Sequence, residues 1–266
     1  MEFLKIVRRR SFLHDLLYVV LNVALAIGLM VIIRVTGSLL PAFALVLMSM
    51  WRVLAVRIRF WVANIQANLV SAIVSFSFVI FLYITNLSSS GSLRIFIIQS
   101  LLVLAYIGWL LIVKPRSKRV FVVAQAGIAL FVGITAIFAL TYSWIATPVV
   151  LMVFIVGYSC ARHVLTNYEE THTMLLSAAW GFVLAQIGWL AYHWTVAYRL
   201  PLLNDILLPQ ISVVAICFGF VSYKAYNSYF HYQKIRLNDI ILPLAFSISI
   251  IGVLLLAFNG VNTSAI

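Results

Sequence analysis

The chain is a succession of apolar runs, separated by short polar segments that are too small to form domains of their own. A helix rises about 1.5 Å per residue, so about 20 apolar residues cross a hydrocarbon core of about 30 Å. Within that core every backbone polar group needs an internal partner, and a helix supplies one for nearly all of them. The sequence therefore predicts an all-α fold, a polytopic transmembrane helical bundle.

Nine runs have the length and composition of membrane spans, or come close to them. The second is the weakest, because it is short and contains Pro41. We predict a single integral membrane domain over residues 1–266, with no soluble domain. The predicted spans cover residues 15–33, 36–51, 62–85, 94–113, 120–141, 144–161, 174–194, 205–223 and 239–258.

The composition agrees with a lipid solvent. The chain is 65% hydrophobic and 9% charged, with a formal net charge of +12, whereas a soluble chain is about half apolar and about a quarter charged. The basic residues stand in short clusters between the apolar runs, as they do where charge sets membrane topology. We therefore expect no nucleic-acid partner. The expected partners are the lipid bilayer and the anionic lipid headgroups of the cytoplasmic face.

The distribution of Lys and Arg predicts the orientation. If the N-terminus is cytoplasmic and there are nine spans, fifteen of the 18 basic residues fall on the cytoplasmic side. The remaining three, Arg34, Arg94 and Arg199, fall outside. Positive residues are enriched in short cytoplasmic loops, so we predict a cytoplasmic N-terminus and an external C-terminus. We expect the protein in the plasma (inner) membrane of a prokaryote.

Carboxylates are absent from the middle of every predicted span. Intramembrane acids are costly and usually mark ion pathways, so their absence argues against a proton-coupled carrier. A pathway for a neutral solute or a lipid stays open, and we expect no cofactor. The six acids lie in loops or at span ends: Glu2, Asp15, Glu169, Glu170, Asp205 and Asp239.

A polar stripe follows one face of the third span. Asn64, Asn68, Ser71 and Ser75 are spaced by 4, 3 and 4 residues, which places them on a common helix face. One interpretation is hydrogen bonding between helices, and the other is the wall of a hydrated pocket. Gln186, the one amide of the seventh span, would need polar partners if it is buried. These five residues are the candidate pocket.

Small residues form a second pattern, in the seventh span. Ser177, Gly181, Ala185 and Gly188 share one helix face, and small side chains let helix backbones approach closely. We interpret this face as a helix-packing seam. A membrane-protein partner could use such a seam together with the basic loops, which would make the chain a scaffold or accessory subunit.

The polar segment between the sixth and seventh spans contains four residues of metal-binding type. His163, Glu169, Glu170 and His172 are weak metal candidates, because their spacing matches no zinc motif and the loop should be solvated. We expect no metal, and no residue is assigned a catalytic role. An intramembrane enzyme would require these histidines and glutamates to converge.

A seven-residue repeat opens the last two predicted spans. Leu203–Pro209 (Leu-Asn-Asp-Ile-Leu-Leu-Pro) recurs as Leu237–Pro243 (Leu-Asn-Asp-Ile-Ile-Leu-Pro). Asn and Asp cap free backbone N–H groups at helix starts, and a carboxylate complements the positive end of the helix dipole. We therefore predict that each copy begins a helix.

The function that the sequence favours is non-enzymatic, a transporter-like or permease-like role for a small neutral solute or a lipid. The alternatives are the accessory subunit and, third, the intramembrane enzyme. An open cavity bordered by the third-span stripe would favour transport. A solid core with an exposed small-residue groove would favour the subunit, and converging His and Glu side chains would favour the enzyme.

Overall fold

The computed structural model describes residues 2–88, 91–141, 144–193, 197–200 and 203–257. Within these residues the chain is almost entirely helical, and seven helices are long and apolar enough to cross a membrane. The prediction of an all-α bundle of membrane helices is confirmed at this level. It agrees with an integral membrane protein.

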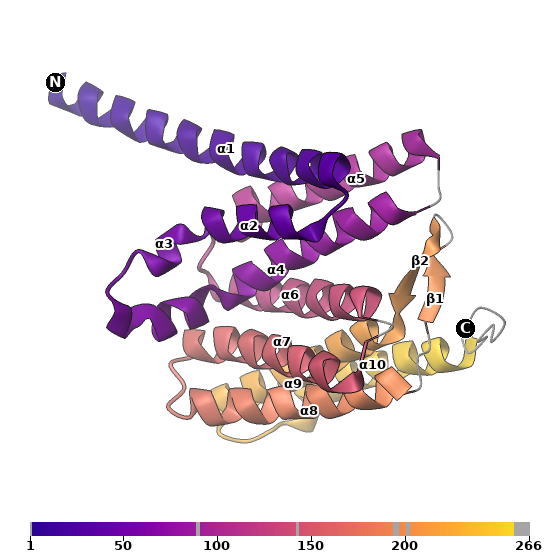
Figure 1. Ribbon diagram of the computed structural model, residues 1–266. Helices are drawn as coiled ribbons and strands as arrows, with labels where there is room; N and C mark the ends of the chain where they lie inside the picture. The colour runs from indigo at the N-terminus through magenta and orange to yellow at the C-terminus, as the bar shows by residue number, and fades with distance from the viewer. Residues whose placement is uncertain (1, 89–90, 142–143, 194–196, 201–202, 258–266) are drawn as a thin grey trace.

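The elements succeed one another with short connections (Figure 1). A two-stranded antiparallel sheet, β1 (Ala197–Leu200) with β2 (Leu203–Pro209), stands between α8 and α9. The helices are α1 (Glu2–Thr36), α2 (Leu39–Ser49), α3 (Trp51–Leu54), the 3-10 turn η1 (Ile58–Phe60), α4 (Trp61–Leu87), α5 (Ser92–Gly108), the π-helical turn η2 (Trp109–Val113), α6 (Arg119–Leu140), α7 (Ala146–Asn167), α8 (Thr173–His193), α9 (Gln210–Tyr232) and α10 (Leu237–Ala257).

The long helices run side by side, and the chain passes back and forth between two ends of the bundle (Figure 1). α1 begins at one end, and α10 finishes at the opposite end. We call the end where α1 begins the basic end, because most basic residues lie at or near it. Those with described side chains are Arg57, Arg59, Lys114, Arg116, Lys118, Arg119, Arg162, Lys224, Lys234 and Arg236.

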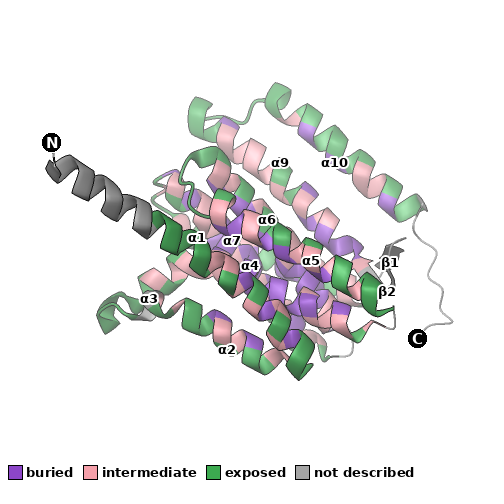
Figure 2. Ribbon diagram, turned by 90° about the horizontal axis from the view of Figure 1, so that it is seen from above, coloured by how far each residue is buried: buried purple, intermediate pink, exposed green. Residues whose placement is uncertain are grey.

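The buried core lies around α4, α6 and α7. α6 packs against α4, α7 and α9, and it contributes the fully buried residues Ala129 and Ile134. α1 and α10 lie at the edges and turn many apolar side chains outward (Figure 2). An outward apolar face is what a helix in contact with lipid requires, since lipid tails are as apolar as leucine.

The second predicted span is shorter as a helix than predicted. α2 has 11 residues, or about 16 Å of helix, which is about half of the hydrocarbon core. Pro41 falls in its first turn, where proline is tolerated. The helix breaks at Met50, and the chain continues through α3 and η1. Segment 39–60 as a whole still returns the chain to the basic end (Figure 1).

The two copies of the repeat have different structures. The second copy begins α10, with Asp239 in its first turn. The first copy forms β2, so the prediction that it begins a helix is wrong, and α9 instead starts at Gln210 and continues to Tyr232. The two copies differ in their neighbours. The first copy pairs with the segment Ala197–Leu200, so its backbone N–H and C=O groups find hydrogen-bond partners in an extended strand.

The fifth and sixth predicted spans are separate helices. α6 ends at Leu140 and α7 begins at Ala146, and the backbone N–H of Trp144 donates to the carbonyl of Thr141 at 2.9 Å. Tyr142 and Ser143, the residues predicted to join the two spans, lie outside the described residues.

Candidate functional site

An open hollow of about 380 Å³ lies between α6, α7, α8 and α9. Its volume falls in the range of about 300–1,000 Å³ that is typical of small-molecule sites. Aliphatic side chains and glycines make up most of its lining. We call it the α6–α9 pocket. Its lining residues are Val123, Ala126, Gly127, Leu130, Cys160, Ala161, Val164, Leu165, Leu176, Trp180, Ile216, Gly219, Phe220, Ser222, Tyr223 and Tyr226.

Small residues keep the pocket open. One face of α6 lines the pocket and carries Val123, Gly127 and Leu130, which recur at helical spacing. A Cβ atom added to Gly127 would meet nothing within 4 Å, whereas one added to Gly219 would come 3.3 Å from Leu130 Cδ2. The space beside Gly127 is therefore free of protein atoms and belongs to the hollow.

The pocket opens between α8 and α9. α8 packs extensively on α7 but hardly touches α9. Leu176 of α8 and Phe220 of α9 both line the pocket, and both remain exposed, by 37% and 40% respectively. The opening therefore lies at the side of the bundle, between two exposed apolar side chains.

An aromatic cluster stands where the pocket approaches the basic end. Tyr223 and Tyr226 line the pocket. Tyr168, at the end of α7, packs edge-on against Tyr226 and Phe230, with ring centroids 5.2 Å and 4.9 Å apart. Its hydroxyl donates to Asn227 Oδ1 at 2.9 Å. The cluster joins the C-terminal end of α7 to the C-terminal half of α9.

Arg119 covers this cluster. Its guanidinium carbon lies 4.3 Å from the ring centroid of Tyr168 and 5.5 Å from that of Phe230. The described contacts of the guanidinium are thus with aromatic rings. Burial, followed by the hydrogen bond with Tyr223, raises the pKa of Tyr168 to about 12. Because the phenol stays protonated at neutral pH, the positive charge of Arg119 is not neutralised by it.

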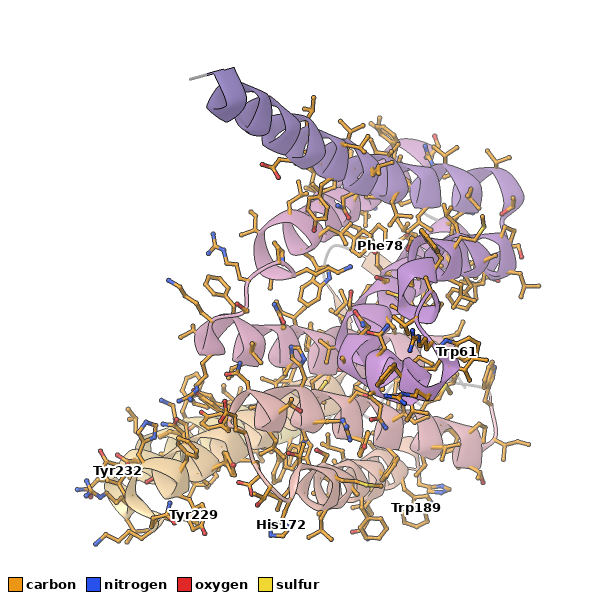
Figure 3. All side chains as sticks on the ribbon, turned by 90° about the vertical axis from the view of Figure 1, so that its left-hand side faces the viewer. Trp61, Phe78, His172, Trp189, Tyr229 and Tyr232 are labelled. Carbon is orange, nitrogen blue, oxygen red and sulfur yellow. The ribbon has the colours of Figure 1, made fainter. Side chains whose placement is uncertain are left out.

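The turn between α7 and α8 is bonded to Tyr226, one of the residues that line the pocket. Glu170 accepts a hydrogen bond from the hydroxyl of Tyr226 at 2.5 Å and one from the backbone N–H of His172 at 3.3 Å. These two bonds, the first above all, lower the pKa of Glu170. Figure 3, which looks onto the basic end, shows His172 near the same edge as Tyr229 and Tyr232 of α9.

The third-span stripe is occupied with hydrogen bonds of its own. Asn64 Nδ2 donates to the carbonyl of Val53 at 2.6 Å, and the hydroxyl of Tyr106 donates to Ser75 Oγ at 2.8 Å. Asn68 Nδ2 donates to the carbonyl of Asn64 at 2.8 Å. These bonds tie α4 to α3 and α5. None of the stripe residues lines the α6–α9 pocket, and their predicted role as a pocket wall stays a prediction.

Two further residues complete the predicted pocket set. Ser71 Oγ is buried and has no hydrogen-bond partner in the described part of the chain. Gln186 is exposed on α8, and α7 and α6 lie between that helix and α4 (Figure 1). The structure therefore does not bring Gln186 to the stripe.

The small residues of α8 face α7. Ser177, Gly181, Ala185 and Gly188 are all buried. A Cβ atom on Gly181 would lie 3.0 Å from the carbonyl oxygen of Phe154, so the two backbones are in close approach. Since α7 already covers this face, it offers no groove to a partner protein.

Two of the four predicted metal candidates, His163 and Glu170, take part in structural hydrogen bonds through their side chains. Gln125 Nε2 donates to the carbonyls of Val113 and Arg116, at 2.7 and 2.9 Å. Its Oε1 must then be the acceptor in the 2.8 Å contact with His163, whose Nε2 carries the proton. Glu170 bonds to Tyr226. Among the described residues, no three His, Cys, Asp or Glu side chains lie close enough to hold a metal ion.

A second hollow, of about 300 Å³, lies at the basic end between α9 and α10 and is lined by polar residues. Ser228 Oγ donates to Asp239 Oδ2 at 2.7 Å and accepts the backbone N–H of Arg236 at 3.1 Å. These bonds fix the start of α10 on α9. The lining consists of Lys224, Asn227, Ser228, His231, Tyr232 and Asp239.

Sequence reasoning did not find the α6–α9 pocket. One signal was available, because the tyrosines at 223 and 226 follow an apolar run with Gly219 one turn earlier. Such residues were interpretable as interfacial anchors, since aromatic rings prefer the headgroup level. Only the structure shows that two of them face the interior, toward α7.

Comparisons with protein-family models, with curated proteins and with solved structures give no match.

Proposed function

We propose that the protein is a permease-like membrane protein that takes up a lipid, with the apolar chain of the lipid in the α6–α9 pocket. The observation that carries this proposal is an open, largely aliphatic hollow between α9 and three helices, α6, α7 and α8, that are long and apolar enough to span a membrane. A polar solute would lose hydrogen bonds to water there without replacing them, at a cost of about 1–3 kcal/mol per group. An acyl chain has no such cost.

The position of the opening supports a lipid that arrives from the side. Leu176 and Phe220 border the pocket and are also exposed on the lipid-facing surface. A chain that enters between them moves from one apolar medium to another and needs no passage through water. Tyr223 and Tyr226 line the pocket from the C-terminal half of α9, and the head of the lipid would come to rest beside their hydroxyl groups.

The proposed topology has nine crossings, with the N-terminus in the cytoplasm and Ile266 outside, in the inner membrane of a prokaryote. Seven crossings are the long apolar helices. The other two are segment 39–60 and α9, which each carry the chain between the two ends (Figure 1). The concentration of positive charge at the basic end supports its assignment to the cytoplasmic side.

The experiment that tests lipid uptake fills the pocket. In Gly127→Phe the ring would enter the free space beside Gly127. Gly252→Phe on α10 is the matched control, because a Cβ atom there also meets nothing within 4 Å and Gly252 does not line the pocket. Lipid retention by the purified proteins is measured by native mass spectrometry as lipids of one type are titrated.

Gly127→Phe should weaken lipid binding by at least tenfold, since excluding about two methylene groups removes about 1.6 kcal/mol. Gly252→Phe should bind as the unchanged protein does. Equal lipid binding by both variants would contradict the pocket assignment.

The permease-like role has its own assay. A lipid with a fluorescent headgroup is placed in proteoliposomes, and its movement between leaflets is followed by chemical quenching from outside. The unchanged protein and Gly252→Phe should accelerate the movement, and Gly127→Phe should not. If the unchanged protein moves lipid no faster than empty liposomes do, the permease-like role is wrong, whatever the binding data show.

A further inference from the structure

Three helix faces of the α6–α9 pocket lead to the same cluster. On α6, Arg119 stands one turn before Val123 and two turns before Gly127. Residues three and four apart lie on one helix face, so the guanidinium follows directly on the apolar lining. The lining faces of α7 and α9 end in the same way, at Tyr168 and at Phe230, the two rings that Arg119 covers.

We propose that the lipid is an anionic phospholipid and that Arg119 binds its phosphate. This inference rests on the proposed uptake of a lipid chain by the α6–α9 pocket. It adds the chemistry of the head: the chain occupies the aliphatic part of the pocket, and the phosphate lies at the basic end beside the aromatic cluster.

The position of Arg119 suits a bidentate contact. Its two described partners are ring faces, at 4.3 and 5.5 Å, and a ring face attracts the cation without accepting all five N–H donors of the guanidinium. Donors in a planar fork match two phosphate oxygens. The rings also restrict the long side chain before the lipid arrives, which lowers the entropy lost on binding.

The charges around the cluster favour an anionic head over a zwitterionic one. The turn before α6 adds Lys114, Arg116 and Lys118 to the positive charge of Arg119. The nearby acid, Glu170, already accepts bonds at both oxygens, from Tyr226 at Oε2 and from the backbone of His172 at Oε1. The exposed carboxylate of Glu169 stands in the same turn, so two carboxylates are outnumbered there by four basic residues, and the net positive charge favours a head that carries a negative charge and no cation.

The attached chain distinguishes a lipid phosphate from free phosphate. The aliphatic lining of the pocket begins beside the aromatic cluster. A ligand with an attached acyl chain therefore buries apolar surface in the pocket, which a bare anion cannot do. Inorganic phosphate should therefore compete weakly for the site.

The test compares two phospholipids with identical acyl chains, phosphatidylglycerol and phosphatidylcholine. Each is titrated into the full-length protein in detergent, and retained lipid is measured by native mass spectrometry. The variants are Arg119→Gln and Arg119→Lys. The matched control is Arg57→Gln, which removes an exposed charge from the same end of the bundle, far along the chain from the pocket.

The unchanged protein and Arg57→Gln should prefer phosphatidylglycerol by about tenfold, because the choline cation of phosphatidylcholine meets the same basic cluster that attracts its phosphate. Both lipids carry the phosphate, so Arg119→Gln should weaken the binding of both, and it should also reduce the preference, because less positive charge then disfavours the choline. Arg119→Lys should keep part of the preference, because a point charge replaces the fork. Inorganic phosphate in millimolar excess should leave the bound lipid in place.

Two results would overturn the headgroup assignment alone: equal binding of both lipids by the unchanged protein, or an undiminished preference in Arg119→Gln. Displacement of the lipid by inorganic phosphate would identify free phosphate as the ligand of Arg119 and overturn the lipid source. If neither phospholipid binds the unchanged protein, the proposed lipid uptake fails as well. Loss of both lipids in Gly127→Phe, with the preference intact in Arg57→Gln, supports both proposals.

Discussion

The buried side chain of Gln125 is the hydrogen-bond partner of several polar groups near the basic end. Its amide nitrogen serves the carbonyls of Val113 and Arg116, its oxygen accepts from His163, and its side chain is 6% exposed. A buried group that loses its partner keeps the full cost of desolvation. One amide therefore holds the turn before α6 against α7.

Replacing Gln125 with Leu should lower the free energy of unfolding by about 1–3 kcal/mol, the usual cost of leaving buried polar groups unpaired. The measurement is thermal unfolding in detergent, with Gln186→Leu as the control, since Gln186 is exposed on α8. Equal midpoints for the two variants would show that water replaces the amide and that the contact contributes little.

The individual site residues were only partly predictable from the sequence. Asn64, Asn68 and Ser75 all lie in α4, and their spacing predicts a shared face because helical periodicity is local. The pocket was not predictable, since Val123 and Tyr226 meet only after four helices have packed at particular rotations. Residue type decides which side chains are apolar, and tertiary packing decides which of them face each other.

At the scale of elements, the α7–α8 pair is the tightest contact of the bundle. The carbonyl of Phe154 and the backbone of Gly181 are close enough that a single added methyl group would stand 3.0 Å from the oxygen. A backbone atom cannot rotate away as the end of a side chain can. Close approach of this kind is where small residues contribute most to helix association in membranes.

Gly181→Ala should destabilise the protein by about 1–3 kcal/mol through overpacking, despite the better helix propensity of alanine. Gly252→Ala should be neutral or slightly stabilising, because its Cβ atom meets nothing within 4 Å. The midpoints of thermal unfolding of the two variants show whether the cost of overpacking or the gain in helix propensity is larger. A higher midpoint for Gly181→Ala would mean that the helices separate at no cost.

The sequence predicted the helices that consist of apolar runs. It failed for β2, whose conformation depends on pairing with a neighbouring segment. Runs of apolar residues predicted α4 through α8 and α10 to within a few residues at most ends. The first repeat copy carries the same leading residues as the second, yet it pairs with Ala197–Leu200 and becomes β2. The conformation of the first copy depends on this neighbouring strand, and the seven-residue pattern itself contains no information about it.

At the scale of the whole molecule, the distribution of charge predicts the orientation in the membrane. The described connections at residues 114–118 and 233–236 lie at the basic end, and the start of α5 lies at the opposite end (Figure 1). Reporter fusions that are active only in the cytoplasm should report at residues 117 and 235 and stay silent at residue 91 and at the C-terminus. A cytoplasmic signal from the C-terminus would contradict nine crossings.

A photoreactive phospholipid can show whether a lipid chain occupies the α6–α9 pocket. A phosphatidylglycerol with a diazirine in its acyl chain is equilibrated with the protein in membranes, activated by light, and located by peptide mass spectrometry. The adducts should concentrate on the pocket segments 123–130, 160–165 and 216–226, and Gly127→Phe should remove them selectively. Adducts spread evenly over the outward faces of α1 and α10, with no enrichment in the pocket segments, would contradict the account.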